Sequence, residues 1–182
     1  ASTIPSIIIS GCLGPRGDGY DPGRIMSETE AESYHRRQAS VLATAGADQL
    51  TAITMTNVPE AIGITCAAQS VGLPVAISFT VETDGRLPTG DSLSDAVNAV
   101  DRATNSAPAY YMINCAHPTH FAAVLKDNEE WVKRIGGVRA NASRCSHAEL
   151  DAMTELDRGD AQELAEQHSV LRQRFPHIKV LA

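Results

Sequence analysis

The sequence lacks a long apolar stretch, an excess of basic residues and a Pro- or Gly-rich linker. The apolar run Ile7-Ile8-Ile9 is far shorter than the roughly 20 residues that span a bilayer, and too short for the apolar region of a signal peptide. The net charge of -7 argues against nucleic-acid binding, which needs a basic surface. We therefore expect a soluble, cytoplasmic protein without a membrane or nucleic-acid partner.

The cysteines do not form the pattern of a disulfide-stabilised secreted protein. Only four are present in 182 residues, and they are widely spaced: Cys12, Cys66, Cys115 and Cys145. In a reducing compartment such cysteines serve as core residues, catalytic groups or metal ligands. A composition of 43% hydrophobic and 20% charged residues is that of a globular protein, and we expect a single domain over residues 1–182.

Short apolar runs alternate with stretches of helical spacing. The runs predict strands at residues 6–10, 50–55, 74–81, 109–115, 137–142 and 178–181. Helices are predicted at 27–45, 59–71, 92–104, 118–134 and 160–175, with a helical turn at 148–156. Ser27 and Glu30 form a capping box, and Pro59 suits a first helical turn. The strict alternation predicts parallel strands joined by right-handed crossovers.

Such a sheet is either open and doubly wound or part of a (β/α)₈ barrel. The turn Gly11-x-x-Gly14-Pro15-x-Gly17 has the wrong spacing for a dinucleotide-binding site, which disfavours the open sheet. In a barrel the carboxyl ends of all strands surround one mouth, where active sites lie. Polar and reactive residues collect at those ends, which favours the barrel: Cys12, Thr54, Ser78, Thr80, Asn114, Cys115, Asn141 and Ser143.

A complete (β/α)₈ TIM barrel has about 250 residues, whereas this sequence predicts six strands. It starts at Ala1 rather than at methionine and ends at Ala182 within or just after a strand. We therefore expect an incomplete barrel of about strands three to eight, with the N-terminal strands and the C-terminal end missing.

Several segments, in this order, resemble the homocysteine S-methyltransferase family. They are Gly11 to Tyr20 (GCLGPRGDGY), Tyr34-His35-x-x-Gln38, Ala45 to Asp48 (AGAD), Pro74 to Thr80 (PVAISFT), Ile113 to Pro118 (INCAHP), Arg139 to Ser143 (RANAS) and Ser146 to Asp151 (SHAELD). The resemblance covers essentially the whole chain. It implies a (β/α)₈ barrel that transfers a methyl group from a methyl donor to the sulfur of homocysteine, giving methionine.

The resemblance also implies a zinc ion held by three cysteinates. In the family one cysteinate follows an asparagine at the end of the sixth strand, and Asn114-Cys115 matches it. The other two form a Gly-Gly-Cys-Cys motif after the eighth strand, which we expect beyond Ala182. Cys115 is therefore the predicted metal ligand. We do not expect Cys12 and Cys145 to complete a zinc site with it, and Cys66 is predicted to lie in the core.

The predicted substrate-binding residues are Thr54, Ser78, Asn114, Asn141 and Ser143. Asn141 and Ser143 either bind the amino-acid end of the substrate or cap their own loop. Ile53 occupies the position of a family glutamate that would hold the ammonium group of homocysteine. A charge-assisted hydrogen bond of about 1.5–3 kcal/mol is lost there. Another thiol or a selenol thus remains open as the acceptor.

Two alternative functions remain open. Ile53 favours a degenerate, thiol-binding or regulatory barrel that has lost methyl transfer. Alternatively, Cys115 is a nucleophile without metal, with His117 as its base, although a histidine at a helix start also suits a structural role. His35 is predicted to lie on a solvated, charged helix face. The sequence does not distinguish the methyl donors that relatives use, which include S-methylmethionine, S-adenosylmethionine, betaine and methyl-folate.

Overall fold

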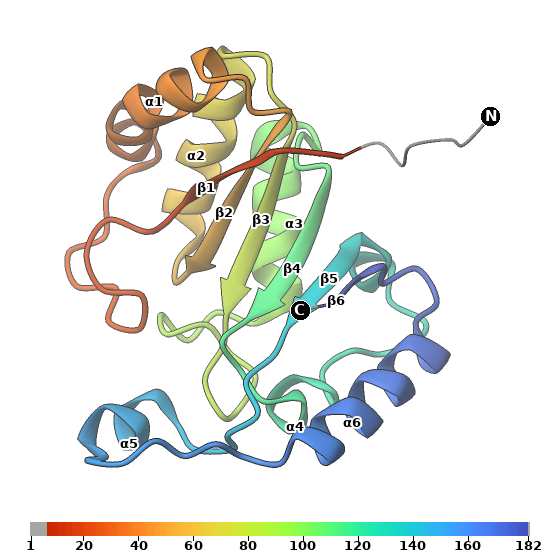
Figure 1. Cartoon of the computed structure of the whole chain (residues 1–182). Coiled ribbons are helices and arrows are strands. Elements are labelled where there is room, and N and C mark those ends of the chain that lie inside the picture. Colours follow the sequence, from red (N-terminus) through yellow and green to blue (C-terminus); the bar gives the residue numbers. More distant parts are fainter. Residues whose placement is uncertain (1–6, 182) are drawn as a thin grey trace.

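A computed structural model describes residues 7–181, and its six parallel strands form one sheet (Figure 1). The strands are β1 (Ser10–Leu13), β2 (Gln49–Met55), β3 (Val75–Thr80), β4 (Tyr110–Asn114), β5 (Ile135–Arg139) and β6 (Val180–Leu181). Each strand pairs with its neighbours in sequence, in the order β1-β2-β3-β4-β5-β6. A doubly wound sheet would reverse this order at a switch point. The structure therefore confirms the incomplete barrel, which we call the half-barrel.

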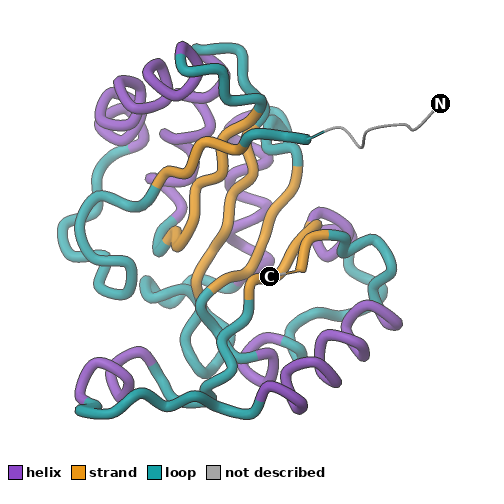
Figure 2. Tube along the Cα trace, in the orientation of Figure 1, coloured by secondary structure: helices purple, strands orange, loops and turns teal. Residues whose placement is uncertain are grey.

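Helices cover one face of the half-barrel. Helices α2 (Val58–Ser70) and α3 (Leu93–Thr104) lie behind the sheet in Figure 1, and α1 (Glu28–Thr44) packs beside α2 at the upper left. The core lies between them and the sheet. The remaining helical elements are α4 (Pro118–Phe121), the 3₁₀ helix η1 (Glu130–Arg134), α5 (His147–Ala152) and α6 (Ala161–Arg174). In the described part of the chain no helix packs over the opposite, concave face (Figure 2). No helix among residues 7–181 is long and apolar enough to cross a membrane.

Gly63 allows α1 and α2 to approach closely. A Cβ atom on Gly63 would lie 2.6 Å from the backbone nitrogen of Glu32 and 2.7 Å from the carbonyl oxygen of Glu28, both on α1. Backbone atoms cannot move aside as a flexible side chain can, so the glycine is required by the packing of the two helices.

We expect Gly63→Ala to destabilise the protein, although alanine is the better helix former by about 1 kcal/mol. Overpacking of a core costs about 1–3 kcal/mol, and here it acts on two helix backbones. Urea unfolding of Gly63→Ala and of the exposed α1 control Ser33→Ala would measure the difference. A Gly63→Ala variant as stable as the wild type would contradict the close helix contact.

The first strand lies four residues later than the sequence predicted. Of the predicted strand, Ser6 lies outside the described residues, and Ile7 and Ile8 are 82% and 65% exposed. The glycine that was expected to end the strand, Gly11, lies within β1, opposite Leu50. A Cβ there would lie 2.9 Å from the side chain of Leu42. Gly11 is therefore a site of close packing rather than a turn.

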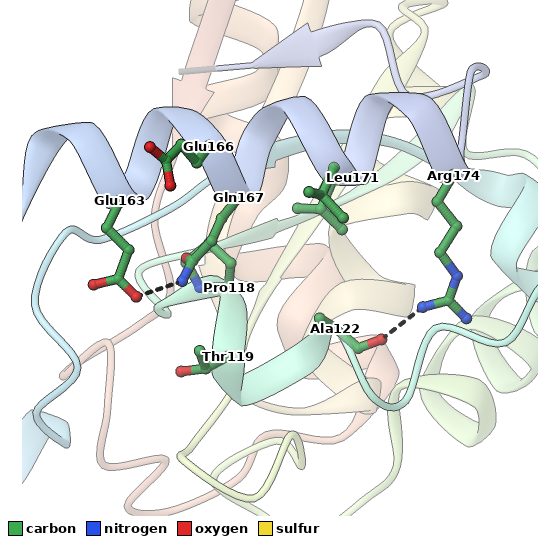
Figure 3. Close-up of a pocket in the computed structure, with 9 residues that line it drawn as sticks. Pro118, Thr119, Ala122, Glu163, Glu166, Gln167, Leu171 and Arg174 are labelled. Carbon is green, nitrogen blue, oxygen red and sulfur yellow. Dashed lines mark hydrogen bonds between the residues drawn. The ribbon is translucent and has the colours of Figure 1, made fainter.

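The predicted helix 118–134 is wrong in its middle. It is replaced by α4, a turn and η1, because a side chain from α6 binds the backbone between them. The Arg174 guanidinium donates to the carbonyl oxygens of Ala122 (3.4 Å) and Leu125 (2.7 Å) and to Asp127 Oδ1 (2.6 Å). Figure 3 shows Arg174 on α6 reaching the carbonyl oxygen of Ala122, which follows α4. Residues of α4 and α6 line a groove of about 380 Å³.

His35 also differs from its prediction. It is 1% exposed and lies between α1 and α2, where its Nε2 hydrogen-bonds with Glu60 Oε1 at 2.8 Å. Other predictions for α1 and α2 are confirmed. The capping box of Ser27 and Glu30 starts α1, and Pro59 lies in the first turn of α2.

Candidate active site

Asn114 joins three strands at their carboxyl ends. Its side chain is fully buried, and Oδ1 accepts hydrogen bonds from Ser78 Oγ (2.5 Å) and from the backbone nitrogen of Thr54 (3.0 Å). Its Nδ2 donates to Thr54 Oγ1 (2.9 Å). Three of the predicted substrate-binding residues therefore contact one another, and together they fix the ends of β2, β3 and β4.

Thr54 has an unusual backbone conformation within this cluster. Its φ of 62° is left-handed, which is rare for a β-branched residue, and the register of β2 shifts between Ala52 and Met55. Two hydrogen bonds with Asn114, one donated by the Thr54 backbone nitrogen and one accepted by Thr54 Oγ1, hold Thr54 in this conformation. Backbone strain of this kind is found preferentially at functional sites.

Cys115 follows Asn114 directly and is half-buried. Its backbone nitrogen donates to the carbonyl oxygen of Arg139 on β5 (3.0 Å), and its φ is 54°. Side chains along a strand alternate between the two faces of a sheet, and the left-handed backbone interrupts this alternation. The chain therefore changes direction at Cys115, at the rim of the half-barrel, and β4 ends at Asn114.

Two aromatic rings from other loops meet beside Cys115. Tyr20, in the connection between β1 and α1, stacks on His147 at the start of α5, with ring centroids 3.8 Å apart. The Tyr20 hydroxyl lies near enough to the Cys115 side chain for Cys115 to raise the pKa of the phenol. His147 Nε2 lies 3.4 Å from Thr80 Oγ1 on β3. Figure 1 shows α5 and the β1–α1 connection at the arrowhead end of the strands.

The protonation of this aromatic pair follows from its surroundings. Burial and the neighbouring Cys115 raise the pKa of Tyr20, so the phenol stays protonated and serves as a hydrogen-bond donor. Burial lowers the pKa of His147, so its imidazole is neutral near pH 7. The site therefore presents a sulfur atom, a hydroxyl donor and a neutral ring within one cluster.

Sequence reasoning gave no role to Tyr20 or His147. Both residues lie in segments that carry the family resemblance, and that position is the only signal the sequence offers. Their contact joins residues 127 positions apart, and no local pattern of spacing predicts it.

Asn141 and Ser143 lie in different surroundings. The backbone nitrogen of Asn141 donates to the carbonyl oxygen of Ala116 (3.1 Å), which places Asn141 beside the segment that follows Cys115. The Ser143 hydroxyl instead donates to Asp157 Oδ2 (2.6 Å) and accepts from the backbone nitrogen of Cys145 (3.1 Å). Ser143 therefore hydrogen-bonds within its own loop, and its role in binding the substrate stays a prediction.

His117 has a structural partner. Its Nδ1 accepts from the backbone nitrogen of Thr119 (3.3 Å) and hydrogen-bonds with the Thr119 hydroxyl (2.8 Å) at the start of α4. Burial and the positive charge of Arg144 lower the pKa of His117. The ring nitrogen nearest the helix is thus already used, which disfavours His117 as a base for Cys115.

The described residues supply one sulfur donor at the rim. Cys12 is exposed on β1, Cys66 is half-buried on α2, and the Cys145 thiol faces Asp157 (3.7 Å). Within residues 7–181, no group of three or more His, Cys, Asp or Glu side chains could hold a metal ion. Cys115 suits a metal ligand by its sulfur and its half-buried place at the rim, but the described half-barrel alone does not form a three-ligand zinc site.

The model of the homocysteine S-methyltransferase family matches residues 1–174. The chain belongs to this family. Homocysteine S-methyltransferase 3 of Arabidopsis thaliana is 28% identical over 105 residues, which are 57% of this chain and 30% of that protein.

Solved structures of the homocysteine methyltransferase MmuM from Escherichia coli have the same fold. The metallated form matches with a TM-score of 0.71 and 18% identity over 97% of this chain and 56% of that chain. The apo form matches with a TM-score of 0.66 and 18% identity over 97% of this chain and 57% of that chain. This chain thus spans just over half the length of these structures, and the fold is confirmed.

Proposed function

We propose that the complete protein transfers a methyl group to the thiol of homocysteine, giving methionine, with Cys115 as one thiolate ligand of a zinc ion. Family membership supports the methyl-transfer chemistry. The observation that carries the assignment to Cys115 is its position. It is a half-buried sulfur at the carboxyl end of β4, beside the Asn114 cluster and the Tyr20–His147 pair.

The reaction forms one sulfur–carbon bond and breaks one bond between the methyl group and its donor. The acceptor sulfur loses its proton and supplies the electron pair of the new bond, while the donor atom keeps the pair of the broken bond. Zinc, held by Cys115 with two cysteinates that the described half-barrel does not contain, would keep the acceptor thiol deprotonated. A free thiol with a pKa of about 8.5 is mostly protonated at neutral pH.

The residues of this chain then orient the reacting sulfur. The Asn114 cluster fixes the ends of three strands and with them the position of Cys115. Tyr20 and His147 stack on each other at the rim, where the two rings would shield one side of the sulfur from water. Asn141 follows β5 and bonds to Ala116, the residue after Cys115, and would bind the amino-acid part of the acceptor there.

Ile53 on β2 favours a second candidate, a thiol-binding barrel without methyl transfer. It is a half-buried aliphatic side chain and cannot hold an ammonium group as a carboxylate would. The same observation leaves another thiol or a selenol as the acceptor of an active enzyme.

A product assay tests the proposal. The protein expressed from its complete gene is mixed with homocysteine and, in turn, with S-methylmethionine, S-adenosylmethionine, betaine and methyl-folate, and methionine is measured by mass spectrometry. We expect methionine with at least one donor. Parallel reactions with cysteine and selenocysteine would test other acceptors. Binding of homocysteine without turnover of any donor would favour the barrel that has lost methyl transfer.

A further inference from the structure

Glu60 is a buried carboxylate that lies outside the rim. It is 3% exposed in the first turn of α2. Its Oε1 accepts from the backbone nitrogen of Arg16 (2.7 Å) and pairs with His35 Nε2 (2.8 Å), and its Oε2 accepts from Asn57 Nδ2 (3.3 Å). A buried charge of this kind is costly unless it is fully hydrogen-bonded. Each oxygen of Glu60 has a partner, and the strongest of these contacts hold α1 and the β1–α1 connection.

The segment from Arg16 to Tyr20 is short, and hydrogen bonds and close packing fix its backbone. Asp18 Oδ1 accepts from the backbone nitrogen of Tyr20 (2.7 Å), which forms a tight turn. Gly19 lies against Thr54, because a Cβ on Gly19 would be 2.9 Å from the Thr54 methyl group. Only three residues lie between Arg16, whose backbone Glu60 binds, and Tyr20, whose ring stacks on His147. A movement of Arg16 is therefore transmitted to Tyr20.

We propose that Glu60 is a positioning residue, which holds the backbone of Arg16 so that Tyr20 packs on His147 beside Cys115. The inference rests on the proposed function only in taking Cys115 as the functional sulfur. Glu60 reaches Cys115 through the loop and contacts neither the thiol nor the rings.

Two substitutions of Glu60 separate its hydrogen bonds from its charge. Glu60→Gln keeps an oxygen that can accept from both Arg16 and His35, and conflicts only with the amide of Asn57. Glu60→Ala removes every contact. If the hydrogen bond to Arg16 positions the loop, the glutamine variant retains most of the wild-type geometry and the alanine variant loses it.

Alkylation of the individual cysteines tests the proposal without measuring activity. The complete protein is treated with EDTA to remove metal and then with iodoacetamide under native conditions, and the labelling rate of each cysteine is followed by peptide mass spectrometry. Cys66, on the same helix as Glu60, reports local or global unfolding. We expect the rate of Cys115 relative to Cys66 to rise about tenfold in Glu60→Ala, the equivalent of one lost hydrogen bond to a charged group. In Glu60→Gln the labelling rate of Cys115 relative to Cys66 should stay within about twofold of the wild-type value, since the main contacts of residue 60 remain.

Gly19→Ala and Tyr111→Phe complete the experiment. Gly19→Ala displaces the same loop without disturbing a buried charge, and it should also raise the labelling of Cys115. Tyr111→Phe deletes a buried hydroxyl that donates to Asp101 (2.8 Å), far from the loop, and serves as the control for lost stability. It should leave the ratio of Cys115 to Cys66 unchanged.

An unchanged ratio of Cys115 to Cys66 in Glu60→Ala would overturn the inference, including the case in which all cysteines are labelled uniformly faster. Because labelling requires no metal, its outcome is independent of whether Cys115 binds zinc, which the metal content of Cys115 variants decides separately.

Discussion

Replacement of Cys115 by alanine is expected to remove bound zinc from the complete protein and to abolish methyl transfer. The loss of one thiolate leaves an incomplete ligand set, and even the loss of an outer-shell partner costs about 10–100-fold in metal affinity or activity. We therefore expect a decrease of more than about a hundredfold in zinc affinity. Zinc content per protein by mass spectrometry and methionine formation measure the two effects.

The other cysteines provide matched controls for Cys115. Cys66→Ala changes a half-buried thiol on α2, and Cys12→Ser changes an exposed one on β1. Both variants should keep the zinc content of the wild type. A normal zinc content in Cys115→Ala would remove the proposed assignment of the metal ligand.

His35→Ala is expected to cause the largest loss of stability among single substitutions in α1. It leaves the Glu60 carboxylate buried without its strongest side-chain partner, and breaking a buried pair in this way costs about 3–5 kcal/mol. Urea denaturation followed by circular dichroism would measure the change in the free energy of unfolding.

The neighbouring Arg36→Ala is the control for His35→Ala. Arg36 pairs with Glu32 on the exposed side of the same helix, and such surface pairs contribute less than about 1 kcal/mol. Equal effects of the two substitutions would contradict the importance of the buried pair.

Lowering the pH should reveal a further difference in stability between His35→Ala and the wild type. Burial alone would raise the pKa of Glu60, but hydrogen bonds from His35, Arg16 and Asn57 hold it below its usual value. A lowered carboxyl pKa contributes stability that is present above the unfolded-state pKa and lost as the pH falls through the folded-state value. In His35→Ala the pKa of Glu60 rises, so this loss should begin at a higher pH than in the wild type.

The sequence predicted the order of elements because that order follows from local patterns. Capping residues such as Ser27 and the apolar runs of β3 and β4 each mark an element without reference to distant residues. The exceptions involve tertiary contacts. The helix predicted at 118–134 is interrupted because Arg174 binds its carbonyl groups, and His35 is buried because Glu60 lies opposite it.

The residues of the candidate site also form two groups, those that the sequence predicted and those that it did not. Thr54, Ser78 and Asn114 come together because parallel strands in sequence order bring their carboxyl ends to one rim. Tyr20 and His147 could not be predicted, since each is placed by a connection whose path depends on side chains elsewhere. Whether these residues contact a substrate stays a prediction for the experiments above.

The pairing of each strand with its neighbour in sequence has a consequence for how the chain reaches its native state. Within residues 7–181 every strand pair joins strands that are neighbours in sequence, so each loop that must close to form these pairs spans one βα unit. The entropy of loop closure grows with loop length, and topologies dominated by nearby contacts fold faster. The sheet can therefore grow one βα unit at a time, and the Cys115 rim forms only when the β4 and β5 units have joined those that came before.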